Sequence, residues 1–122
     1  MSEALVVITT TETFAEAERL AHQLVERELA ACVQILPHMT AVYRWQGKIE
    51  HANEALLLIK TTSAAYPKLE QAIRELHSYQ TPEIMALPAA AISAEYLAWI
   101  LSCMDTSRRD DFPLNSSYLS AR

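Results

Sequence analysis

A chain of 122 residues is the size of one domain, and a hydrophobic content of 51% is enough to build a core without disulfides. The formal net charge is −5 and the ten basic residues are scattered, which argues against a nucleic-acid interface, because polyphosphates bind to basic patches. Two cysteines without CxxC spacing favour a reducing compartment. The apolar run near the N-terminus is too short for a membrane span and lacks the basic flank of a signal peptide. We therefore expect a cytoplasmic domain that binds neither nucleic acid nor membrane.

The first predicted elements are a strand and a helix. Residues 4–10 are a β-branched apolar run, typical of a buried strand. Thr13, followed three residues later by Glu16, fits a capping box, in which Thr13 accepts from first-turn amides and Glu16 reaches back. Apolar residues then recur at three- and four-residue steps, which predicts a helix through about Glu28.

A long hairpin is predicted next. The strand at 31–35 is interrupted by Pro37, which cannot donate to a ladder, so we expect a sheet edge or a bulge there. The strand resumes at 41–45, and the only glycine of the chain, Gly47, predicts a turn with a positive φ. The returning strand, 49–60, is apolar in its middle on both faces.

A helix, a short strand and a further helix complete the predicted domain. Ser63 is the expected cap of the second helix, with Pro67 in or near its first turn. Prolines flank the strand at 83–87, which again favours a sheet edge. Ser93 begins the third helix. Residues 105–122 are polar and lack periodicity, so we expect a mobile tail.

The order of these elements predicts an α+β fold. Strand, helix, strand, strand, helix, strand and helix suit a ferredoxin-like βαββαβ arrangement with an additional C-terminal helix. The strands at 4–10 and 49–60 should be central in the antiparallel sheet, because the other two carry the prolines. We expect one domain over residues 1–104, followed by the tail.

Both faces of the two central strands are apolar. Two helices cover only one face of such a sheet, and an exposed second face should alternate with polar residues. Leaving four large side chains in water would forgo roughly 6–12 kcal/mol per subunit. The third helix and another subunit are the two available covers, and a helix of about ten residues covers part of a sheet at best. The sequence therefore predicts a closed homo-oligomer.

Five segments carry a family resemblance. They are LAACV (29–33), YRWQGKIE (43–50), IKTT (59–62), LHSYQTPEI (76–84) and YLAWI (96–100). In this order and spacing the chain resembles the CutA family over residues 4–104. The resemblance implies a cytoplasmic trimer, related in architecture to PII signalling proteins, that is involved in tolerance of copper and other divalent ions.

The chain departs from the family pattern at several positions. Some members have a cysteine at the end of the first strand and two adjacent histidines after the second helix, proposed as copper ligands. Thr9 and Leu76 stand at two of these positions, and only His77 is retained. One imidazole is an incomplete metal site, because soft metals normally take three or four ligands. Ser78 replaces a proline and His38 a glycine, at a turn that favours positive φ.

Four residues are candidates for a ligand cleft between subunits: Lys60, His77, Tyr79 and Glu83. His77 either complements the dipole at a helix end or binds a ligand, a weak metal site included. Tyr79 is either a packed side chain with a bonded hydroxyl or a binding residue. Lys60 ends an apolar strand, where it forms either an intersubunit salt bridge or a contact to an anion.

Other residues have structural interpretations. Tyr43, Arg44 and Trp45 lie near the hairpin tip and are expected at the trimer interface, since arginine and aromatic residues are enriched in interface cores. Cys32 and Cys103 are expected to be inert, small hydrophobes without a basic neighbour in sequence.

The function expected from these features is binding, not catalysis. With one glycine there is no phosphate-cradling loop, and no GxSxG, HExxH or paired-cysteine motif occurs. We expect a homotrimer in divalent-ion (copper) tolerance that binds a metal or a small ligand between subunits, with copper or another divalent cation as the candidate cofactor. The alternatives are a PII-like sensor of a small anionic metabolite and an assembly protein without a small ligand.

Overall fold

The computed structural model describes residues 3–104 of the chain. The predicted tail, residues 105–122, lies outside these residues. The elements, in chain order, are β1 (Ala4–Thr11), α1 (Phe14–Glu26), β2 (Cys32–Trp45), β3 (Lys48–Thr62), α2 (Tyr66–Leu76), β4 (Met85–Pro88) and α3 (Ala94–Met104).

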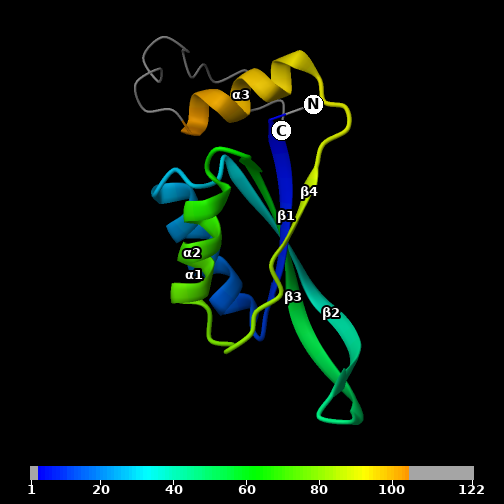
Figure 1. Cartoon of the computed structure of the whole chain (residues 1–122). Coiled ribbons are helices and arrows are strands. Elements are labelled where there is room, and N and C mark those ends of the chain that lie inside the picture. Colours follow the sequence, from blue (N-terminus) through cyan, green and yellow to red (C-terminus); the bar gives the residue numbers. More distant parts are fainter. Residues whose placement is uncertain (1–2, 105–122) are drawn as a thin grey trace.

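The four strands form one antiparallel sheet in the order β2-β3-β1-β4. β1 and β3 are central, and the proline-bearing β2 and β4 are the edges, as predicted. Figure 1 shows α1 and α2 side by side on one face of this sheet, with α3 across one of its ends. The α+β, ferredoxin-like arrangement with an additional C-terminal helix is confirmed.

The β2–β3 hairpin contains the predicted bulge. Leu36 pairs with Leu56 and Met39 with Glu54, so two residues of β2 face one residue of β3. His38 has φ 61° within this bulge, which is the positive φ expected at its position. The strand continues through Pro37 without ending, and at the tip Gln46 and Gly47 have φ 50° and 80°, as in a type I′ turn.

Of the two predicted caps at the starts of α1 and α2, the first is half confirmed and the second is wrong. Thr13 accepts from the Glu16 amide at 3.1 Å, but the Glu16 carboxylate turns away to Ser78, so the reciprocal half of the capping box is missing. Ser63 does not cap α2: its hydroxyl donates to the Glu3 carbonyl, and the Ala65 amide donates to Thr62 Oγ1 instead.

The remaining boundaries are close to those expected. Pro67 lies in the first turn of α2, and Ser93 Oγ accepts from the Tyr96 amide at the start of α3, both as predicted. α1 ends at Glu26, slightly earlier than expected. β4 covers Met85–Pro88 instead of 83–87, since Pro88 keeps an edge position that needs no donated hydrogen bond.

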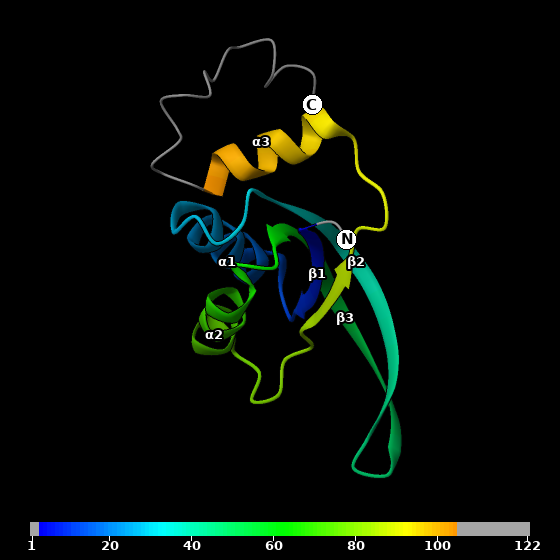
Figure 2. The same ribbon diagram turned by 45° about the horizontal axis from the view of Figure 1, so that its top comes forward.

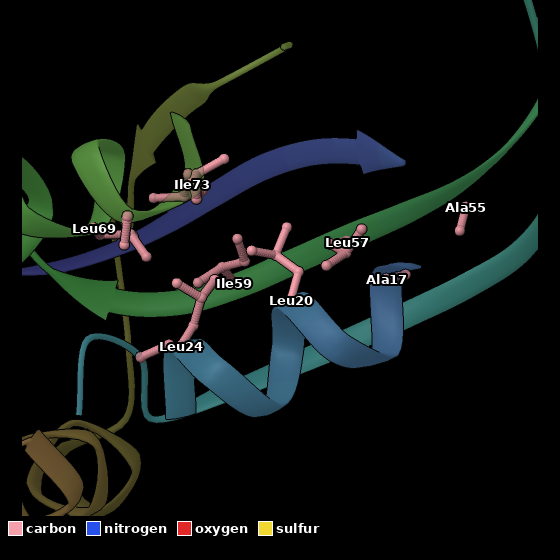
Figure 3. Packing of buried hydrophobic residues seen from close by; sticks show 11 residues of the cluster. Ala17, Leu20, Leu24, Ala55, Leu57, Ile59, Leu69 and Ile73 are labelled. Atoms are coloured by element: carbon pink, nitrogen blue, oxygen red, sulfur yellow. The ribbon is translucent and has the colours of Figure 1, made fainter. Parts of the chain in front are cut away.

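The main core lies between the sheet and α1 and α2, on what we call the helix face. Figure 3 shows Leu20 and Leu24 of α1 directed toward Leu57 and Ile59 of β3, and all four are at most 3% exposed. Leu69 and Ile73 of α2 complete the same cluster. The apolar stripes predicted for the helices are therefore buried on this face.

The second face of the sheet lies opposite. It carries Val6, Ile8, Cys32, Leu36, Leu56, Leu58, Lys60, Met85 and Leu87. α3 packs only at one end, on Ala4, Ala31 and Cys32 (Figures 1 and 2). Val6, Ile8, Leu56 and Leu58 are half-buried, and three large side chains at the two edges stay 46–50% exposed: Leu36, Met85 and Leu87. Within residues 3–104, α3 thus leaves most of this face uncovered.

Candidate functional site

His77 links the end of α2 to the central strand β1. It is the C-cap residue of α2, and its side chain is fully buried. Nε2 bonds to the carbonyl of Thr10, and Nδ1 accepts from the Tyr79 amide at 3.0 Å. Because a carbonyl can only accept, the proton is on Nε2. Both ring nitrogens are therefore used by the backbone, and His77 presents no lone pair to a ligand in this conformation.

Glu16 holds the segment after His77 against α1. Its carboxylate accepts from the amide and the hydroxyl of Ser78, each at 3.0 Å, and lies 3.8 Å from His77 Nδ1. The Glu16 side chain is only 12% exposed. Ser78 supplies the two donors of this link, its backbone amide and its hydroxyl.

Tyr79 reaches the edge of the second face. Its hydroxyl donates to Glu54 Oε2 at 2.9 Å, and the Thr10 hydroxyl contacts the same oxygen at 3.5 Å. Burial, and then the hydrogen bond to Glu54, raise the pKa of Tyr79 well above its ordinary value. The phenol thus remains a donor, and its ring packs 4.8 Å from the His77 ring.

The four predicted cleft residues do not form one site within a chain. His77 and Tyr79 lie together, but Lys60 lies six residues from Glu54 along β3, about 20 Å away. Glu83 is exposed and makes no ion pair with any residue in the described range. Their role as ligand residues stays a prediction.

Glu16, Glu54, His77, Ser78 and Tyr79 form one hydrogen-bonded group, which we call the His77 cluster. Sequence reasoning missed Glu16 and Glu54 as members of this cluster. The available signal for Glu54 was its position on the second face of β3, where a carboxylate precedes an apolar run. Glu16 was assigned to a local cap, and only the tertiary structure brings Ser78 to it.

The residues of one chain do not fit a metal centre. Within residues 3–104 no group of three or more His, Cys, Asp or Glu side chains is placed to hold an ion. Thr9 is buried in the sheet, and its hydroxyl has no partner there. Leu76, at the other altered position, is 37% exposed. A copper site that includes His77 would need a change in its hydrogen bonds and ligands from elsewhere.

An open groove borders the cluster on its helix side. It is lined by Glu12, Thr13, Ala15, Glu16, Glu18, Arg19, Leu20, His22, Gln23, Leu76 and Ser78. None of the four predicted cleft residues lines it. Its lining carries both acidic and basic side chains.

The hairpin tip has the exposure expected of an interface. Tyr43 and Trp45 are 43% and 56% exposed, and Val42 and Ile49 beside them are 62% and 56% exposed. The hairpin projects beyond the rest of the sheet (Figure 1). The hairpin tip thus exposes several large apolar side chains next to Arg44. Its role as a subunit interface stays a prediction.

Known proteins resemble the chain over most of its length. The model of the CutA1 divalent ion tolerance protein family matches residues 5–103. The divalent-cation tolerance protein CutA of Thermus thermophilus is 48% identical over 95 residues, which are 78% of this chain and 92% of that protein. The crystal structure of CutA from Xylella fastidiosa has a TM-score of 0.83 at 38% identity, and covers 85% of this chain and 100% of its own.

A further similar structure is described as the periplasmic divalent cation tolerance protein CutA from Archaeoglobus fulgidus. Its TM-score is 0.81 at 36% identity, with 84% of this chain and 99% of that one covered. No helix in residues 3–104 is both long and apolar enough to cross a membrane. Family model, relatives and fold agree, and the chain belongs to the CutA1 divalent ion tolerance family.

Proposed function

We propose that the chain acts in divalent-ion tolerance as a cytoplasmic homotrimer that binds, without catalysis, a metal ion or a small ligand in clefts between its subunits. The observation that carries this proposal is the uncovered apolar second face. Covering a large apolar side chain stabilises by about 1.5–3 kcal/mol, and this face offers several. The number of three subunits rests on the family resemblance.

The hairpin supports the same assembly. β2 is an edge strand of 14 residues, and exposed edges pair readily with other strands. Its tip is too apolar to be left in solvent, with Val42, Trp45 and Ile49 each more than half exposed. A second copy on the second face would bring its own side chains to the Tyr79–Glu54 pair, and a cleft would form there.

Copper is the first cation to test. Because one chain lacks a complete ligand set, any site would combine residues of different subunits. The names of the Thermus and Archaeoglobus relatives mention divalent cations and do not specify copper.

Native mass spectrometry of untagged protein, titrated with copper(II), counts subunits and bound ions together. We expect copper bound to the assembled species. If His77 gives up its backbone hydrogen bonds to join the site, the occupancy in His77→Gln is lower than in the matched surface variant His51→Gln. Equal occupancy in the two variants would remove His77 from the site, and copper-free assemblies at saturating metal would contradict copper binding altogether.

The position of Lys60 favours a second candidate function, the recognition of a small anion. This cation lies on the second face and is remote from the His77 cluster, so it would serve a different ligand. A PII-like sensor of an anionic metabolite remains the alternative proposal.

A further inference from the structure

The bulge in β2 creates a row of side chains across the second face. Upstream of the bulge, Cys32 pairs with Lys60, Lys60 with Val6, and Val6 with Leu87. The four side chains lie on the same face because paired residues in a sheet point to the same side. Lys60 is thus placed between a thiol and a valine near the middle of the sheet.

Helix α3 places Tyr96 over this row. The Tyr96 hydroxyl is 3.9 Å from Cys32 Sγ, and the Lys60 Nζ lies 5.8 Å from the centre of the Tyr96 ring. Tyr96 also stacks on Trp99 at 5.7 Å, and Trp99 is only 6% exposed. Tyr96 is itself half-buried, so its ring is held in part by these packed neighbours.

Lys60 has no counter-ion among residues 3–104. No carboxylate oxygen there lies within 4.0 Å of its Nζ, whereas Arg74 pairs with Glu70 on the surface of α2. Lys60 is half-buried beside Val6 and Cys32, so part of its aliphatic stem lies on apolar surface. The ring face of Tyr96 lies near the ammonium, but a cation–π contact is weaker than an ion pair.

We propose that Lys60 and Tyr96 form a binding site for a single carboxylate group attached to an apolar body. The ammonium would pair with the carboxylate, the Tyr96 hydroxyl would donate a hydrogen bond to it, and Val6 and Leu87 would contact the apolar body. The low polarity of the surroundings strengthens such an ion pair. The site offers a single ammonium group, and the net charge of the chain is −5. A ligand with one negative charge therefore suits this site better than a polyanion.

The carboxylate has two possible sources, a free small acid or an acidic side chain of a second copy. Both supply the same chemistry to Lys60, and an experiment separates them. The inference rests on the anion-recognition candidate proposed above and not on copper binding, so a failure of the metal proposal leaves it intact.

The chain has three lysines, which makes side-chain NMR a direct probe. In protein labelled with ¹⁵N and ¹³C only at lysine, sodium butyrate is titrated at constant ionic strength, with butanol as the control. For a free acid, we expect a saturable shift of the Lys60 Nζ and Cε signals, while the exposed Lys48 and Lys68 do not respond. Tyr96→Phe should weaken butyrate binding about three- to tenfold, the equivalent of one hydrogen bond.

If a second copy already supplies the carboxylate, butyrate leaves Lys60 unchanged and Lys60→Met reduces the assembled fraction in sedimentation, while Lys68→Met does not. That result also supports the carboxylate site. The proposal is overturned if Lys60 responds to butyrate no more than Lys48 and Lys68 do, and Lys60→Met assembles like the wild type.

Discussion

The two faces of the sheet carry side chains of similar hydrophobicity but differ in how they are covered. On the helix face, Leu57 and Ile59 are completely buried by α1 and α2. On the second face, Leu56 and Leu58 of the same strand are only half-buried, and Met85 and Leu87 are about half exposed. One face is therefore completed within residues 3–104, and the other stays open there, which is the observation behind the proposed assembly.

The largest expected effect comes from comparing two neighbouring leucines of β3, one on each face of the sheet. Leu57→Ala should lower the free energy of unfolding by about 2–5 kcal/mol, because it opens a cavity in a packed core. Leu58→Ala, its neighbour on the second face, should act mainly on assembly. Urea unfolding and sedimentation of both variants check this comparison, and equal effects of the two in both measurements would contradict it.

A charge placed on the second face should separate the subunits. Leu87→Lys puts an ammonium on a side chain that is 46% exposed in one chain, so the chain should fold while its assembly weakens, by tenfold or more in the dissociation constant. The matched variant is Leu76→Lys. Leu76 is 37% exposed at the end of α2, away from the second face, so this variant should assemble normally. Analytical ultracentrifugation with circular dichroism shows whether folding and assembly separate in this way.

A smaller effect is expected where the two faces meet. Tyr79→Phe removes the hydrogen bond to Glu54 and should cost about 1–2 kcal/mol at neutral pH. Tyr43→Phe is the control, since the Tyr43 hydroxyl bonds to nothing in residues 3–104, and it should change stability by less than about 0.5 kcal/mol.

The pH dependence of this difference has a defined sign. Burial and Glu54 raise the pKa of Tyr79 above its ordinary value of 10.0, so the folded state keeps the phenol proton longer than the unfolded state. The stabilisation is complete below pH 10 and is lost as the pH rises beyond it. Denaturation of wild type and Tyr79→Phe from pH 8 to 11 should show the gap closing above pH 10; a gap that widens there would be inconsistent with the raised pKa.

Sequence patterns were sufficient for the strand order, because the two central strands are apolar on both faces and the edges carry prolines. They also predicted the bulge at Pro37 and the positive φ at His38. They could not predict the register that results. Without the bulge, Cys32 would pair with Thr61, whose side chain lies on the helix face; the extra residue brings Lys60 opposite instead.

The candidate site was less predictable for a related reason. Glu16 had a plausible local partner in a capping box, and its carboxylate instead binds Ser78, 62 residues away. The position of His77 at the end of α2 was anticipated, but not that both ring nitrogens would bond to the backbone. Such contacts depend on how helices pack on the sheet, and periodicity within one element contains no information about that.

Sedimentation velocity of the unmodified protein at micromolar concentration is the most direct test of the uncovered second face. We predict one species of about three times the 13.7 kDa mass of a single chain, stable on dilution. A folded species of 13.7 kDa would show that a single copy tolerates this face in water, and would contradict both the assembly and the clefts between subunits.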